Sequence, residues 1–204
     1  LTMWVVAMLV DRQARPGSYV IAGCAAAAAI AIGAETVPFV AVACICVAVQ
    51  WAWHGRSFTA PAQMFGLSLT LAVTAAFLAT VPPSAYAAVT CDNLSLGFYS
   101  LTALGGSGLF LVSSLAKSTQ RAFRFGLLTA MGGLLLLAAK VIAPQCLGDP
   151  LSNLDPLLVE LWLNGVSEAR SVLAELRFEP HLLGIFYAVG LFAQAVCFFR
   201  IIQG

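Results

Sequence analysis

Apolar stretches long enough to cross a lipid bilayer dominate this sequence. A transmembrane helix needs about 20 apolar residues, and four segments meet this requirement with few charged residues: Gln63–Val81, Leu96–Ala116, Phe123–Ala143 and Leu182–Ile201. Across all 204 residues, 61% are hydrophobic and 9% are charged, whereas soluble domains carry about 25% charged residues. The composition excludes a soluble globular domain and predicts an all-α, polytopic bundle of transmembrane helices.

A fifth apolar stretch, Tyr19–Trp53, is too long for one crossing. Pro38 disfavours a helical residue before it, and Glu35 lies near the middle of the stretch. We therefore expect two short helices, Tyr19–Ala34 and Phe39–Trp53, joined by a tight turn that carries Glu35. The alternative is one long, steeply tilted helix.

The first residues favour a chain that begins partway through a helix. Leu1–Val10 is apolar, but ten residues rise only about 15 Å, half of a bilayer. Neither a basic n-region nor a signal-peptidase site is present. We expect a fragment with a partial first helix followed by six full spans, forming a single membrane domain over residues 1–204.

Loop charges predict the orientation. Alternating the loops puts one acidic residue, Asp11, and seven basic residues on one side: Arg12, Arg15, Arg56, Lys117, Arg121, Arg124 and Arg200. The other side receives two basic residues, Arg170 and Arg177, with Lys140 near a helix end, and eight acidic residues: Glu35, Asp92, Asp149, Asp155, Glu160, Glu168, Glu175 and Glu179. Because basic loops stay in the cytoplasm, we expect the first side and the C-terminus to be cytoplasmic in a bacterial inner membrane. The net charge of +1 gives no indication of nucleic-acid binding.

The longest loop, Pro144–His181, has room for structure outside the membrane. Asp155 and Pro156 suit a helix start. Apolar residues follow at helical spacing: Leu158, Trp162, Val166, Ala169, Leu173 and Leu176. The loop is expected to hold an extracytoplasmic amphipathic helix that packs against the other outer segments.

Small residues four positions apart predict close helix packing. The pairs are Ala103 with Ser107, Gly126 with Ala130, and Thr129 with Gly133. Such residues let two helix backbones approach each other in lipid. Packing is the expected role, in preference to a pore or a ligand site.

The six cysteines divide into two groups. Cys24, Cys44, Cys46 and Cys197 fall within predicted spans, where cysteine usually acts as a small apolar residue. Cys91 and Cys146 each fall in an outer loop, on the oxidising side of a bacterial inner membrane. We predict a disulfide between these two, and the alternative is a pair of thiols that never meet.

Candidate chemistry is sparse. The two histidines, His54 and His181, stand apart from any metal or nucleophile motif, so no metal site is predicted. Outer carboxylates could line a cavity for a polar substrate, and Glu35, Asp92 and Glu168 are the candidates. A solvated loop surface is the alternative explanation for each. Catalytic residues remain unassigned.

Three loop motifs occur along the chain: Ile32–Phe39, Pro82–Tyr86 followed by Cys91–Ser95, and Pro144–Pro150 followed by Leu154–Pro156 and Trp162. Their order and spacing resemble the membrane core of bacterial GT-C glycosyltransferases of the dolichyl-phosphate-mannose-protein mannosyltransferase-like group. The resemblance implies sugar transfer from a polyprenyl-phosphate carrier at the outer face, often with a divalent metal. It places the catalytic acidic residue in a first outer loop that no segment here matches, so this chain would carry the later helices.

Two hypotheses follow. In one, the chain is part of a lipid-linked-sugar transferase, with membrane lipid and a polyprenyl-phosphate sugar as partners. In the other, it is a non-enzymatic scaffold, assembly factor or transporter subunit.

Overall fold

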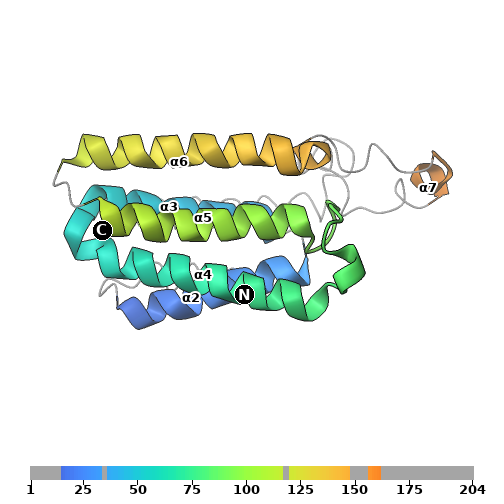
Figure 1. Cartoon of the computed structure of the whole chain (residues 1–204), viewed down its shortest axis with the longest axis horizontal. Helices are drawn as coiled ribbons and strands as arrows, with labels where there is room; N and C mark the ends of the chain where they lie inside the picture. Colours follow the sequence, from blue (N-terminus) through green and yellow to red (C-terminus); the bar gives the residue numbers. More distant parts are fainter. Residues whose placement is uncertain (1–14, 34–35, 117–119, 148–155, 162–204) are drawn as a thin grey trace, which may run out of the picture. The chain divides into compact units, whose positions relative to one another are not determined.

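Each apolar stretch that the structure describes is an α-helix. The computed structural model describes residues 15–33, 36–116, 120–147 and 156–161, and no strand occurs among them. Two compact units divide the chain at Pro150. The first unit contains α2 (Pro16–Ile32), α3 (Val37–His54), α4 (Thr59–Thr80), α5 (Leu96–Leu115) and α6 (Arg121–Ile142) (Figure 1). In the second, the described helix is α7 (Pro156–Leu161).

The stretch from Tyr19 to Trp53 forms two helices, as predicted. Helix α2 ends at Ile32, and Gly33 has an extended backbone with φ −173° and ψ 137°. Helix α3 then begins at Val37, with Pro38 in its first turn, where the missing N–H of proline would have no helical partner anyway. The alternative of one unbroken helix is wrong, while Glu35 itself lies outside the described residues.

Three segments of the described chain are long and apolar enough to cross a membrane: Val37–Thr80, Leu96–Leu115 and Arg121–Ile142. The first contains two helices, α3 of 18 residues and α4 of 22 residues, separated by the 3-10 turn η2 (Gly55–Phe58). At 1.5 Å per residue these helices are about 27 and 33 Å long. The predicted crossings at Leu1–Val10 and Leu182–Ile201 lie outside the described residues.

The helices of the first unit run up and down, so their ends form two groups (Figure 1). We call the first group the arginine end; it comprises the start of α2, the η2 turn and the start of α6. The second group, the disulfide end, comprises the α2–α3 break, the 81–95 loop with its 3-10 turn η3 (Pro83–Ala85), and η4 (Pro144–Leu147). Arg15, Arg56, Arg121 and Arg124 belong to the arginine end, and Asp92 to the disulfide end. The predicted alternation of loops therefore holds for these five helices.

Glycines bring three helices into close contact. A Cβ atom on Gly23 of α2 would lie 2.7 Å from the carbonyl oxygen of Phe65 on α4. A Cβ atom on Gly106 of α5 would lie 2.7 Å from the carbonyl oxygen of Gly66, also on α4. Both contacts are too short for any side chain, so glycine sets the spacing of these helices, as expected for packing in lipid.

The predicted packing of small residues on α6 is not seen. Within the described chain, nothing lies within 4 Å of a Cβ built on Gly126 or Gly133, and Thr129 and Ala130 are exposed. Helical spacing puts these residues on one side of α6, and no described helix packs against that side.

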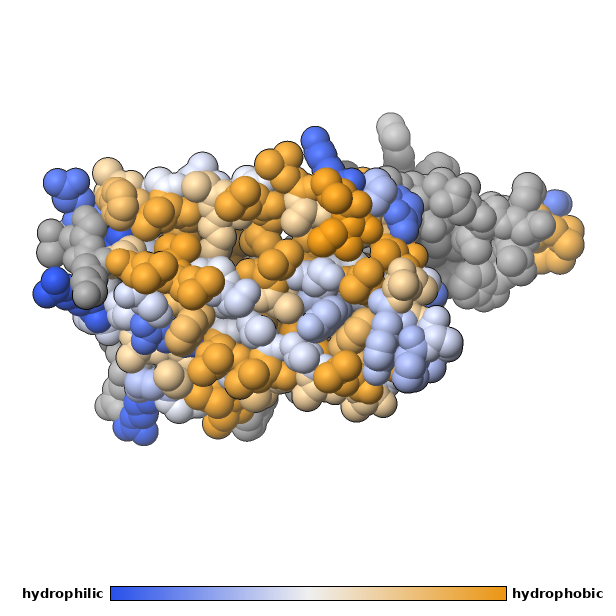
Figure 2. Space-filling view, in the orientation of Figure 1, coloured by the Kyte–Doolittle hydropathy of each residue, from blue (hydrophilic) through white to orange (hydrophobic). Residues whose placement is uncertain are grey.

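Apolar side chains lie over much of the face of the helices that Figure 2 shows. The exposed fractions of Leu137 and Val141 on α6 are 60% and 81%, and Phe39 and Ile45 on α3 are also exposed. Soluble proteins rarely expose contiguous apolar surface on this scale. This surface and the helix lengths together indicate a membrane protein.

Candidate functional site

Aromatic side chains hold the 81–95 loop against the helices at the disulfide end. The ring centroids of Phe77 and Tyr99, on α4 and α5, are 4.4 Å apart in a stacked arrangement. Tyr86, from the loop, packs against Phe77 at 5.2 Å. Farther along, the Ser95 hydroxyl donates to the carbonyl oxygen of Thr90 at 2.7 Å. The loop is thus a folded cover on α4 and α5.

A disulfide joins this cover to the end of α6. Cys91 in the loop is bonded to Cys146 in η4, with 5.3 Å between their Cα atoms, inside the range of about 4.4–6.8 Å that a bridge requires. Beside it, Gln145 Nε2 donates to the carbonyl oxygen of Val89 at 3.4 Å. The predicted pairing is confirmed, and it links two segments 55 residues apart in sequence.

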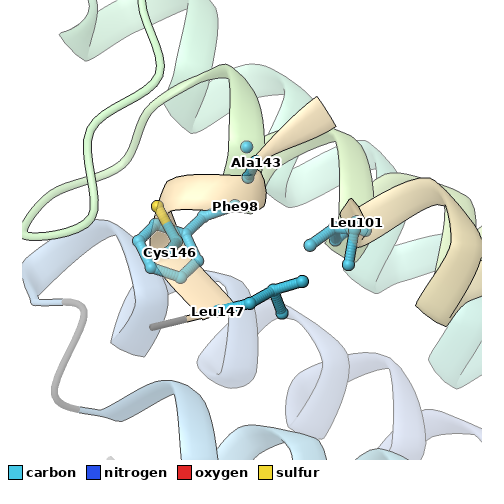
Figure 3. Close-up of a pocket in the computed structure, with 7 residues that line it drawn as sticks. Phe98, Leu101, Ala143, Cys146 and Leu147 are labelled. Atoms are coloured by element: carbon cyan, nitrogen blue, oxygen red, sulfur yellow. The ribbon is translucent and has the colours of Figure 1, made fainter. Parts of the chain in front are cut away.

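An apolar pocket of about 150 Å³ lies between α5 and α6 beside the disulfide. Its lining residues are Gly97, Phe98, Leu101, Ala139, Ala143, Cys146 and Leu147. In Figure 3 the Leu101 and Leu147 side chains extend toward each other across the pocket, and Phe98 lies next to Cys146. A dry cavity of about this size accepts a small hydrocarbon such as benzene. The pocket therefore suits a segment of an apolar chain.

The three predicted carboxylates are only partly described. Asp92 is exposed in the 81–95 loop, directly after the disulfide-bonded Cys91. Glu35 and Glu168 lie outside the described residues, so their place at a substrate cavity stays a prediction. Among the residues that are described, no three His, Cys, Asp or Glu side chains cluster as a metal site would require.

The arginine end contains a second site, which sequence reasoning missed. Arg124, in the first turn of α6, is 5% exposed, and its Nε donates to the carbonyl oxygen of Ala52 at 2.8 Å. Ala52 is in the last turn of α3, where carbonyl oxygens lack helical partners. Arg124 thus caps α3 from a neighbouring helix, as basic side chains near helix C-termini do.

Gly55 makes room for this arginine. It ends α3 with φ 65° and ψ −125°, a backbone conformation that is essentially restricted to glycine. A Cβ atom at this position would lie 2.8 Å from Nη1 and 2.9 Å from Cζ of Arg124. The guanidinium therefore packs directly over the glycine that turns the chain into η2.

Further basic side chains surround the same turn. The guanidinium carbon of Arg121 lies 4.9 Å from the ring centroid of Trp53, a cation–π geometry. A hollow of about 290 Å³ is lined by Trp53, His54, Arg56, Arg121 and Arg124, which we call the arginine pocket. Sequence analysis placed these arginines on the same side of the membrane, with Arg124 at the start of the predicted span Phe123–Ala143, but did not bring them together in one site. The available signal was Gly55, which directly follows an apolar helix and precedes Arg56.

Comparison of the chain with protein-family models, curated proteins and solved structures finds no match.

Proposed function

We propose that this is a multi-pass protein of a bacterial inner membrane, with its arginine end in the cytoplasm and its disulfide end outside. Basic residues favour the cytoplasmic side, and a disulfide favours the oxidising outer side. The two criteria are independent and agree on the orientation. In this arrangement the chain has six full spans, the helix beginning at Pro156 is extracytoplasmic, and the C-terminus is cytoplasmic.

At its outer face the protein handles a lipid-linked substrate, within a GT-C-like glycosyltransferase acting on a polyprenyl-phosphate sugar. The observation that carries this proposal is the apolar pocket beside the disulfide. Cys146 lines that pocket, and its partner Cys91 precedes the exposed Asp92. The site therefore places an apolar pocket next to a carboxylate. A polyprenyl-phosphate sugar likewise has an apolar chain and a polar head. The catalytic acid and the ligands of any divalent metal would come from residues outside the described set.

A non-enzymatic scaffold is the second candidate function. It is favoured by α6, whose small residues Gly126, Ala130 and Gly133 face away from the described helices. Small residues spaced in this way let another membrane helix approach closely. A partner subunit would then cover this surface.

Photo-crosslinking with a diazirine-bearing polyprenyl phosphate tests the transferase proposal in membranes containing the full chain. We expect label on peptides with Phe98, Leu101 or Leu147, and loss of this label when Leu101→Trp fills the pocket. Leu104→Trp is the matched control, because Leu104 lies three residues along α5 and is 46% exposed. Equal labelling of both variants and the wild type would rule out the pocket as the chain-binding site.

A further inference from the structure

We propose that the arginine pocket binds the phosphate group of an anionic phospholipid at the cytoplasmic surface of the membrane. The site is separate from the apolar pocket of the disulfide end. The proposal rests on the side chains that line the arginine pocket, on their charge and on the apolar surface that surrounds the pocket.

Positive charge is concentrated in this pocket. Arg56 and Arg121 are exposed at its rim, and Arg124 is buried in its wall. In the described part of the first unit, the single acidic residue is Asp92, which belongs to the opposite end of the helices. A guanidinium presents paired N–H donors that match the oxygens of a phosphate, so arginine is well suited to bind one.

The three arginines have different roles. Arg124 donates Nε to Ala52 and packs over Gly55, so it fixes the turn that carries Arg56. Arg121 is held in place by its contact with the ring of Trp53. Arg56 and Arg121 thus project from a backbone that is already ordered, which reduces the entropic cost of binding. These two side chains are the direct phosphate ligands.

The surroundings favour a lipid over a soluble phosphate. Trp53 is 53% exposed and Phe123 is 51% exposed, and both lie at the ends of helices with exposed apolar sides. Aromatic side chains at this depth belong to the interface between headgroups and acyl chains. A phospholipid could place its phosphate in the pocket and its acyl chains along α3 and α6. Basic pockets between helices on the cytoplasmic side characteristically bind anionic headgroups.

The size of the pocket agrees with this ligand. One water molecule needs about 10–15 Å³ of cavity volume, and the hollow measures about 290 Å³. A phosphate with its attached glycerol group therefore fits, with bridging water.

Native mass spectrometry of the full chain in detergent tests the proposal, with phosphatidylglycerol as the anionic probe and phosphatidylcholine as the zwitterionic one. We expect phosphatidylglycerol to bind more tightly. Arg56→Ala and Arg121→Ala should each weaken its binding about fivefold, the effect of one basic residue near a lipid headgroup. Arg121→Lys should retain part of the affinity, because it keeps the charge but not the paired donors.

Lys140→Ala is the matched control, since Lys140 is an exposed cation at the other end of the same helix. It should leave phosphatidylglycerol binding unchanged. Equal affinity for the two lipids, or equal losses in the Lys140 and Arg121 variants, would overturn the proposal. A second arm adds inorganic phosphate at increasing concentration. If free phosphate displaced the lipid at equal concentration, the ligand would be a soluble anion, and the lipid assignment would be wrong.

Discussion

The Nε atom of Arg124 lies 2.8 Å from the carbonyl oxygen of Ala52, so the start of α6 completes the last turn of α3, 72 residues earlier in the chain. This contact connects the least buried of the five helices in the first unit to its neighbours. It also positions the turn that carries Arg56, because Gly55 turns the chain beneath the same guanidinium.

Replacing Arg124 with alanine should destabilise the protein. The change removes a charge-assisted hydrogen bond and leaves the Ala52 carbonyl without this donor, at a cost of roughly 1.5–3 kcal/mol. Thermal unfolding of the purified chain in detergent measures the effect. Arg56→Ala removes an exposed arginine from the same pocket and should shift the midpoint far less. Equal shifts in the two variants would contradict a structural role for Arg124.

Gly55→Ala should also destabilise, and for two reasons. Alanine is strained at φ 65°, ψ −125°, at a cost of about 1–3 kcal/mol, and its Cβ atom would clash with the Arg124 guanidinium. Gly126→Ala is the control, because that glycine is helical and has open space around it. Since alanine favours helix, the control should be neutral or stabilising. A tolerated Gly55→Ala would show that the turn is not fixed.

Sequence reasoning predicted the helices but not this contact. Pro38 and Glu35 correctly indicated the break between α2 and α3, because both are local features. Hydropathy placed the start of the next helix at Gln63, whereas α4 begins at Thr59. Pro61 is accommodated there because N–H groups in the first turn have no helical acceptor.

The site itself was predictable only in part. Cys91 and Cys146 could be paired because charge alternation put both on the same side. From the sequence, Arg124 was only one of seven basic residues on the predicted cytoplasmic side. Neither its burial nor its hydrogen bond to Ala52 has a local sequence signature. A contact across 72 residues depends on the packing of α3 against α6, which no periodicity in either helix reveals.

Adjacent glycines on α5 should respond very differently to substitution. Gly106→Ala would put a Cβ atom 2.7 Å from the Gly66 carbonyl oxygen, while Gly105→Ala would meet its nearest neighbour, Leu135 Cδ1, at 3.7 Å. Overpacking of this kind costs about 1–3 kcal/mol. Thermal unfolding in detergent should show a lower midpoint for Gly106→Ala and almost no loss for Gly105→Ala. The reverse order would contradict the packing of α4 against α5.

Removing the disulfide should loosen the cover at the disulfide end. Cys91→Ser opens a loop of 55 residues, worth about 4 kcal/mol in the chain-entropy model, and less where helices persist in the unfolded state. We expect a lower unfolding midpoint and faster proteolysis within residues 81–95. Cys24→Ser, at an unbonded cysteine, is the control. Alkylation of both Cys91 and Cys146 without reductant would show that the bond does not form.

The orientation of the helices is the central claim, and cysteine labelling in intact cells tests it most directly. Single cysteines replace Ser57, in the turn at the arginine end, or Ser84, in the loop at the disulfide end; both positions are exposed. The background keeps the disulfide and replaces Cys24, Cys44, Cys46 and Cys197 with alanine. We predict that a membrane-impermeant maleimide labels Ser84→Cys from outside and labels Ser57→Cys only after the membrane is opened. Labelling of both positions from the same side, or of Ser57→Cys alone from outside, would contradict the account.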